Sequence, residues 1–81
     1  MKTKIEKIIE NGEVIGYKLG NHYLVKIWGW GNKYDWAIND EPQNTYFSVD
    51  EEKRLAEGKM YFVDSCKQGK EELLRLAKEV H

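Results

Sequence analysis

The dipeptide Asn11-Gly12 constrains the fold of this chain more than any other pair of neighbours. Asparagine and glycine tolerate the positive φ angles that both central residues of a type I′ hairpin turn require. The segment before the turn fits either a helix or a strand, because its isoleucines suit both periodicities. The segment after it, EVIGYKL, is rich in β-forming residues. We therefore predict a hairpin, with one strand at about 2–10 and the next at 13–19.

Two more strands are expected to continue this hairpin as a meander. The turn signal Gly20-Asn21 precedes a strand at 22–28, and a glycine-rich bend leads to a short strand at 34–38. Alternation puts only apolar side chains on one face of 22–28, and we expect that face to meet the core together with the more apolar face of 13–19. The residues of these expected core faces are Ile15, Tyr17, Leu19, Tyr23, Val25 and Ile27.

The second half of the chain predicts two helices separated by a strand. After the loop-like stretch 39–44, Ser48 opens a capping box, and Gly58 is suited to end the helix that follows. A strand is expected at 59–64, with Met60 and Phe62 on one face and Tyr61 and Val63 on the other. A second capping box begins at Ser65, and the amphipathic helix after it has an apolar stripe of Cys66, Leu73, Leu74, Ala77 and Val80.

These elements predict one α+β domain over residues 1–81, because a chain of this length cannot sustain two cores. The expected order is β-β-β-β-α-β-α. The antiparallel β meander should be covered on one face by the C-terminal amphipathic helix.

The stretch 28–40, WGWGNKYDWAIND, is the most prominent candidate for a binding surface, because it holds all three tryptophans. If the apolar set of 22–28 faces the core, Trp28 and Trp30 project from the opposite, uncovered face of the sheet. Aromatic side chains dominate protein–protein hot spots, so we expect this face to bind a protein partner. Its predicted contact residues are Leu24, Lys26, Trp28, Trp30, Tyr34, Asp35 and Trp36. The other interpretation is that the three tryptophans form a second small core.

A single-stranded nucleic-acid binder is the alternative function, in which bases stack on tryptophan while lysines contact phosphates. The residues that would serve it are Lys4, Lys18, Lys26, Trp28, Trp30 and Lys33. Lysines 4, 18 and 26 are predicted to share the face of Trp28, which favours nucleic-acid binding. The formal net charge of −1 argues against nucleic-acid binding. A homodimer through the same aromatic patch is the third interpretation.

Catalytic and metal sites are not indicated by the sequence. The soft and imidazole ligands are limited to His22, Cys66 and His81, so no metal or other cofactor is expected. The carboxylates at 50–52 are explained by helix N-terminal electrostatics, and we expect no enzymatic activity. One cysteine fits a reducing compartment, and no apolar run approaches the roughly 18 residues of a membrane span. The expected location is therefore cytoplasmic, with no membrane association.

Two segments, IEKIIENGEVIGYKL at 5–19 and VDEEKRLAEGKMYFVD at 49–64, resemble small α+β proteins of phage and other mobile elements. The likeness consists of a hairpin with the pattern NGxxxGYxL and a short helix with an acidic start that ends in glycine before a strand. It implies an accessory or inhibitor protein that docks on a host protein. The tryptophan-rich stretch between the two segments is not part of the pattern.

Overall fold

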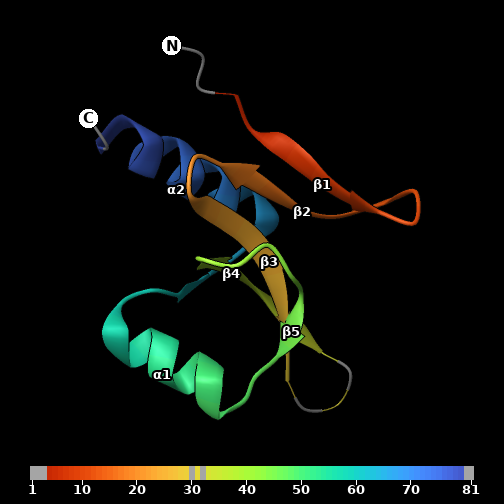
Figure 1. Ribbon diagram of the computed structural model, residues 1–81, viewed down its shortest axis with the longest axis vertical. Helices are drawn as coiled ribbons and strands as arrows, with labels where there is room; N and C mark the ends of the chain where they lie inside the picture. Colours follow the sequence, from red (N-terminus) through yellow and green to blue (C-terminus); the bar gives the residue numbers. More distant parts are fainter. Residues whose placement is uncertain (1–3, 30, 32, 80–81) are drawn as a thin grey trace.

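The computed structural model describes residues 4–29, 31 and 33–79. It confirms the α+β class and the order of the expected elements, and adds one two-residue strand (Figure 1). The elements are β1 (Glu6–Glu10), β2 (Glu13–Leu19), β3 (His22–Trp28), β4 (Tyr34–Asn39), β5 (Thr45–Tyr46), α1 (Val49–Glu57), β6 (Tyr61–Val63) and α2 (Cys66–Glu79). The strands lie in the order β1-β2-β3-β4-β6, with β5 paired in parallel to β3.

The first hairpin forms at the predicted turn, with φ of 52° at Asn11 and 80° at Gly12. A bulge lies close to this turn in β2, where Ile15 is the extra residue because Ile8 pairs with Gly16 and Ile9 with Val14. Gly16 sits opposite Ile8, and a Cβ at Gly16 would lie 2.6 Å from the backbone oxygen of Leu24. Only glycine therefore allows β2 and β3 to approach this closely.

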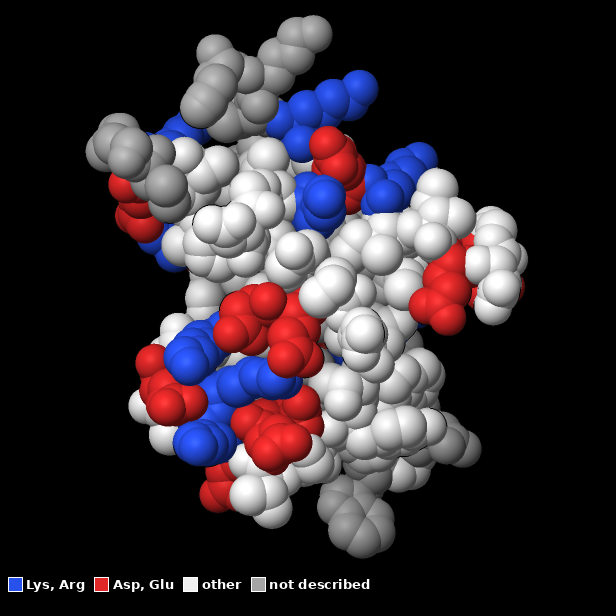
Figure 2. Space-filling model, in the orientation of Figure 1, with Lys and Arg blue, Asp and Glu red and all other residues white. Residues whose placement is uncertain are grey.

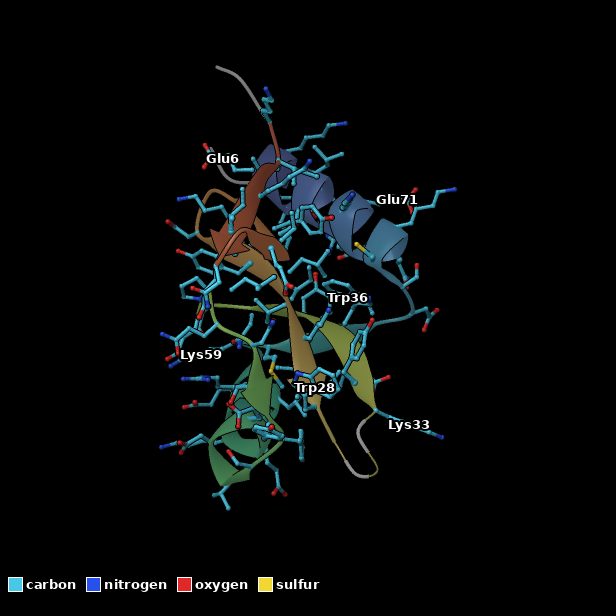
Figure 3. The ribbon with its side chains drawn as sticks, turned by 90° about the vertical axis from the view of Figure 1, so that its right-hand side faces the viewer. Glu6, Trp28, Lys33, Trp36, Lys59 and Glu71 are labelled. Atoms are coloured by element: carbon cyan, nitrogen blue, oxygen red, sulfur yellow. The ribbon has the colours of Figure 1, made fainter. Side chains whose placement is uncertain are left out.

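The C-terminal helix α2 packs on one face of the sheet, as predicted, and α1 packs on the other. On one face, Leu73 of α2 packs with side chains from four strands, Leu19, Leu24, Ile38 and Val63. On the other face, Leu55 of α1 packs against a second cluster of Val25, Ile27, Ala37 and Met60. In Figure 3 the two helices lie on opposite sides of the strands.

The predicted core face of β3 was therefore assigned to the wrong helix. Tyr17 pairs with Leu24, so Tyr17 and Leu19 of the predicted core set of β2 face α2 together with Leu24. Val25 and Ile27 face α1 instead. The error arose because both alternate sets of β3 contain apolar residues, and α1 supplies a cover for the second set. The predicted facing of β6 is correct, since Met60 lies in the α1 cluster whereas Val63 lies in the α2 cluster.

Helix α2 approaches the sheet most closely at Gly69, which is buried. A Cβ built there would lie 2.2 Å from Cδ1 of Leu24. Cys66 and Ala77 of the predicted stripe pack against this core, and so does Leu76, which the prediction omitted. Leu74 is 36% exposed, and Val80 lies outside the described residues.

The ends of α1 lie where the sequence places them, with Ser48 as the N-cap and Gly58 as a left-handed C-cap. The predicted capping hydrogen bond is absent from Ser48, whose hydroxyl donates to the buried carboxylate of Glu51 instead. Arg54 also pairs with Glu51, at 3.2 Å, and it reaches two carboxylates of the loop before α1, Asp40 and Glu41. This network attaches α1 to the end of β4.

The capping box predicted at the start of α2 forms, but one of its two hydrogen bonds has a different donor. The backbone N–H of Gln68 donates to the hydroxyl of Ser65 at 3.1 Å, as predicted. The Gln68 side chain accepts from the N–H of Asp64 at 2.6 Å, one residue before the position expected.

Candidate functional site

Leu24 cannot take part in a binding surface, because it is fully buried beneath α2. The register of β3 with β4 pairs Leu24 with Ile38, Lys26 with Trp36 and Trp28 with Tyr34. All these residues therefore lie on the α2 face of the sheet. The face predicted to be uncovered is thus the face that carries the C-terminal helix, and only its far end extends beyond α2.

At that far end, three aromatic rings pack against one another. The ring centroids of Trp28 and Tyr34 are 5.0 Å apart, and those of Tyr34 and Trp36 are 5.9 Å apart with an edge-to-face arrangement. The ammonium of Lys26 lies 4.7 Å from the Tyr34 centroid and 5.5 Å from that of Trp36. Figure 3 shows Trp28 and Trp36 on the α2 side of the strands.

This aromatic row fits neither sequence interpretation in full. Trp28 and Trp36 are half-buried, while Tyr34 is 41% exposed. The row is an outer margin of the α2 core, since Trp36 also packs against the buried cluster there. Trp30 lies outside the described residues.

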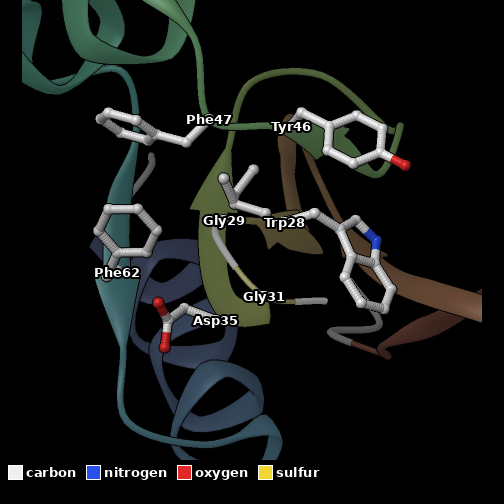
Figure 4. Close-up of a pocket in the computed structure, with 8 residues that line it drawn as sticks. Trp28, Gly29, Gly31, Asp35, Tyr46, Phe47 and Phe62 are labelled. Atoms are coloured by element: carbon white, nitrogen blue, oxygen red, sulfur yellow. The ribbon is translucent and has the colours of Figure 1, made fainter. Parts of the chain in front are cut away.

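A concave site lies on the opposite, α1 face of the same end of the sheet. It is a groove of about 590 Å³ whose lining residues are Ile27, Trp28, Gly29, Gly31, Asp35, Tyr46, Phe47 and Phe62. Figure 4 shows the rings of Trp28 and Tyr46 on one side of the ribbon, and Phe47, Phe62 and Asp35 on the other. Phe47, Phe62 and Asp35 therefore line the groove from the same side of the sheet.

The strand pairings fix these side chains in place. β5 pairs with β3 so that Thr45 lies beside Ile27, and the N–H of Phe47 donates to the carbonyl of Trp28 at 2.8 Å. Alternation then places Phe47 on the face of Ile27. The loop before β5 is held by Asn44, whose side-chain oxygen accepts from the N–H of Lys26 at 2.8 Å.

The second phenylalanine ring and the carboxylate come from β6 and β4. Asp35 pairs with Ile27, and Phe62 pairs with Ala37, so both side chains lie on the groove face. The Phe47 and Phe62 centroids are 6.2 Å apart with a tilt of 35° between the rings. Among the residues that the structure describes, Asp35 has no ion-pair partner within 4 Å.

Exposure distinguishes the groove from its surroundings. Phe47 is 45% exposed, Phe62 is 40% exposed and Tyr46 is 72% exposed. Figure 2 shows the charged side chains of α1 gathered beside a surface over β5 that carries neither basic nor acidic residues. Partly exposed rings that face a concave site form a kind of surface that proteins use for binding.

The lysines of the nucleic-acid interpretation do not share one surface. Lys18 pairs with Tyr23 across the strands and so lies on the α1 face, opposite Lys26. Lys26 shares a face with Trp28 as predicted, and the prediction is wrong for Lys18. Lys18 also lies 3.8 Å from the carboxylate of Glu6. Lys4 and Lys33 are exposed, and Figure 3 shows Lys33 at the tip of the β3–β4 hairpin.

A polar network on α2 is the most strongly perturbed set of titratable groups. The Glu72 carboxylate accepts hydrogen bonds from the Arg75 guanidinium and from the Tyr61 hydroxyl, and these lower its pKa to about 2. Burial, together with the bond to Glu72, raises the pKa of Tyr61 to about 12. The network joins β6 to α2 away from the groove, which indicates a structural role.

Sequence reasoning missed Tyr46, Phe47 and Phe62 as surface residues. Tyr46 and Phe47 come just after the loop-like stretch 39–44, and Phe62 was interpreted only as part of a predicted strand. The adjacent pair Tyr46-Phe47, placed between a loop and a capping box, is the signal that could have identified them. Trp28 and Asp35 are the predicted contact residues that line the groove.

Within residues 4–29, 31 and 33–79, no three or more His, Cys, Asp or Glu side chains are grouped so that they could hold a metal ion. Cys66 is half-buried at the start of α2. None of the helices described is long and apolar enough to cross a membrane. Comparisons with family models, with curated proteins and with solved structures give no match.

Proposed function

We propose that this protein is a small non-enzymatic binding module that docks on another protein through the groove lined by Phe47 and Phe62. The observation that carries the proposal is the exposure of these two rings, at 45% and 40%, in a concave site. A core would bury such rings fully, because leaving them in water forfeits most of their hydrophobic stabilisation.

The apolar surface on this side of the groove consists of its two phenylalanine rings. Phe47 and Phe62 are 45% and 40% exposed, so each leaves roughly 60 to 110 Å² in water, judged from the area that buried aromatic side chains remove from it. Tyr46 is 72% exposed, with its ring on the other side of the ribbon, and Val49 at the start of α1 is 78% exposed. Exposed apolar side chains gathered at a concave site are often linked to function.

A narrower proposal follows from the sequence resemblance alone. The resemblance to small α+β proteins of phage and other mobile elements implies an accessory or inhibitor role, in which the groove would cover a site on a host protein. The single cysteine favours a cytoplasmic location for that role. The groove is compatible with that role, because an inhibitor needs a preformed surface and no catalytic group.

The test compares groove variants with a matched control on a partner isolated by affinity capture and then purified. Phe47→Ser and Phe62→Ser should each weaken the Kd for that partner at least tenfold, since central aromatic anchors contribute about 2 kcal/mol or more. Ile9→Ser is the control, because Ile9 is 62% exposed on the distant β1 strand. Equal affinity of all three variants would show that the partner docks elsewhere.

The alternative function, binding of single-stranded nucleic acid, is supported by the aromatic row Trp28-Tyr34-Trp36 with Lys26 over it. Titration with mixed-sequence oligonucleotides at low and moderate salt tests it. Quenching of tryptophan fluorescence that weakens with salt would favour this function, and no binding at low salt would exclude it.

A further inference from the structure

We propose that α1 is an independent cover, a helix that unfolds and leaves the sheet while the rest of the domain stays folded. Its departure would uncover the buried cluster of Val25, Ile27, Ala37 and Met60. Ile27 also lines the groove, so the uncovered apolar surface would be continuous with the groove. The inference concerns the fold itself and holds whether or not the groove binds a partner.

The first argument is the small apolar contact that holds α1 on the sheet. The apolar residues of this helix are Val49, Leu55 and Ala56. Val49 is 78% exposed and Ala56 is exposed as well, so Leu55 is the side chain that packs on the cluster below. Leu55 is itself only half-buried. Because hydrophobic stabilisation follows the apolar area removed from water, α1 gains little from this packing.

The second argument is that the buried polar group of α1 is satisfied within the helix. The carboxylate of Glu51, which is 3% exposed, accepts from the hydroxyl of the N-cap Ser48 and from Arg54. Outside the helix, Arg54 pairs with Asp40 and Glu41, whose side chains are 45% and 51% exposed. Ion pairs to such exposed groups contribute little. Within residues 4–29, 31 and 33–79, no hydrogen bond or ion pair joins α1 directly to a strand.

The third argument is the contrast with α2, which is attached far more firmly. Leu73 is fully buried, and Gly69 lies directly against Leu24. The Glu72 carboxylate accepts from the hydroxyl of Tyr61 in β6 at 2.6 Å. Regions with few buried apolar contacts open at a lower free energy than the core that they adjoin. We therefore expect α1 to open before α2.

The two ends of α1 allow it to open without disturbing the sheet. Before the helix, the N–H of Phe47 is bonded to the carbonyl of Trp28 at 2.8 Å, and after it Gly58 has a φ of 75°. Both lie outside the helix, so the strands on either side stay paired. A helix of nine residues is marginal in water on its own, so α1 unfolds as it leaves. Figure 1 shows α1 and α2 at opposite ends of the molecule.

The experiment measures amide hydrogen exchange by NMR on the full chain labelled with ¹⁵N, under conditions in which exchange reports the opening equilibrium. The amides of residues 53–57 should share one protection factor, at least about tenfold below that of the most protected amides in β3 and α2. Protection equal to that of the core would overturn the proposal. Protection that rises residue by residue from the helix ends would also overturn it, because fraying gives that pattern.

A core variant separates the opening of α1 from unfolding of the whole domain. Leu24→Ala should lower the protection of the α2 amides about thirtyfold or more, which corresponds to about 2 kcal/mol. The protection of α1 should stay within about threefold of wild type, because Leu24 packs on the other face in both the closed and the open state. A parallel fall in both helices would overturn the proposal. If Leu24→Ala does not fold, Ile38→Val replaces it, with about fivefold expected for α2 and no change for α1.

A pair of variants in α1 tests the contact that closes the helix. Leu55→Ala should lower the protection of α1 by about tenfold, since it removes the apolar side chain that packs on the sheet. Val49→Ala is the matched control, because Val49 belongs to the same helix and is 78% exposed. It should leave the protection of α1 within about threefold of wild type. Equal effects of the two variants would contradict a helix held by Leu55.

Cysteine labelling tests whether the cluster beneath α1 is uncovered when the helix opens. Met60→Cys places a thiol in that cluster, and Cys66→Ser in the same chain removes the native thiol. The opening constant obtained from the rate of labelling should equal that of the α1 amides in the same variant. A constant that equals that of the α2 amides would show that the cluster stays covered until the domain unfolds, and would overturn the proposal.

Discussion

The contact between Leu24 and Gly69 provides a sharp test of the corrected strand facing. Leu24 is fully buried, and a leucine-to-alanine change in such a site lowers the free energy of unfolding by about 2 to 5 kcal/mol. The whole domain is expected to have roughly 4 to 12 kcal/mol, given the usual 0.05 to 0.15 kcal/mol per residue. We therefore expect Leu24→Ala to remove a large part of the stability and still to leave a folded protein.

Gly69→Ala should lower the free energy of unfolding of the wild-type protein and raise that of the Leu24→Ala variant. In the native protein the added Cβ would lie 2.2 Å from Cδ1 of Leu24. Overpacking of this kind costs about 1 to 3 kcal/mol, against about 1 kcal/mol gained from better helix propensity. The net change should be destabilising by about 1 kcal/mol. With Leu24→Ala the clash disappears and the methyl fills part of the space, so Gly69→Ala should stabilise by about 1 to 2 kcal/mol.

Urea unfolding of the wild type, both single variants and the double variant measures this reversal. Leu74→Ala is the matched control, because Leu74 lies on the same helix but is 36% exposed. It should cost about 1 kcal/mol or less and leave the effect of Gly69→Ala unchanged. If Gly69→Ala has the same effect with Leu24 and with Ala at position 24, within about 0.5 kcal/mol, the two residues are not in contact and the assignment of β3 is wrong.

Further predictions concern the two polar networks. Glu72→Gln should lower the free energy of unfolding by about 1 kcal/mol near neutral pH, a value discounted for the solvent around this partly exposed group. A carboxyl whose pKa falls to about 2 on folding stabilises above its ordinary value of 4.5, so the difference from wild type should disappear as urea unfolding is repeated toward pH 2. Tyr61, whose pKa rises to about 12, contributes below its ordinary value of 10.0, so Tyr61→Phe and wild type should converge as the pH rises through 12. Arg54→Met should cost about 2 kcal/mol in thermal unfolding because it leaves buried Glu51 without its guanidinium, whereas Lys53→Met, at an exposed position of the same helix, should change stability by less than about 0.5 kcal/mol. Equal losses for these last two variants would argue against a structural role for the Arg54 network.

The elements of this fold could be predicted because they depend on local chemistry. Asn11-Gly12 fixed the first hairpin, and the spans of β2 and β3 matched the expected ranges. Ser48 and Gly58 bounded α1 as predicted. Such turn and cap signals act within a few residues, so no tertiary information was needed to recognise them.

The facing of β3 could not be predicted from its own sequence. Leu24 and Val25 are neighbours that are both fully buried, one against α2 and the other on the α1 face. When both alternate sets of a strand contain large apolar residues, periodicity does not say which helix covers which face. The buried Gly69 decides it here, because its missing side chain leaves room for Leu24.

The candidate groove overlaps only in part with the binding surface predicted from the sequence. The aromatic stretch does lie at the end of the sheet that carries the groove, and Asp35 lines it. The rings of Phe47 and Phe62, which lie 15 positions apart in sequence, meet only because β5 and β6 flank the β3–β4 hairpin. A meeting of this kind depends on sheet order, which local patterns do not encode.

The most direct test of docking through the groove is photo-crosslinking from single positions. A photoreactive benzoylphenylalanine placed at Phe62 should form an adduct with the captured partner, and the same group at Ile9 should not. Tyr34, on the opposite face of the sheet, is the third position and tests the surface first expected from the sequence. The account predicts an adduct from position 62 that Phe47→Ser weakens. Adducts from position 34 or 9, with none from position 62, would contradict it.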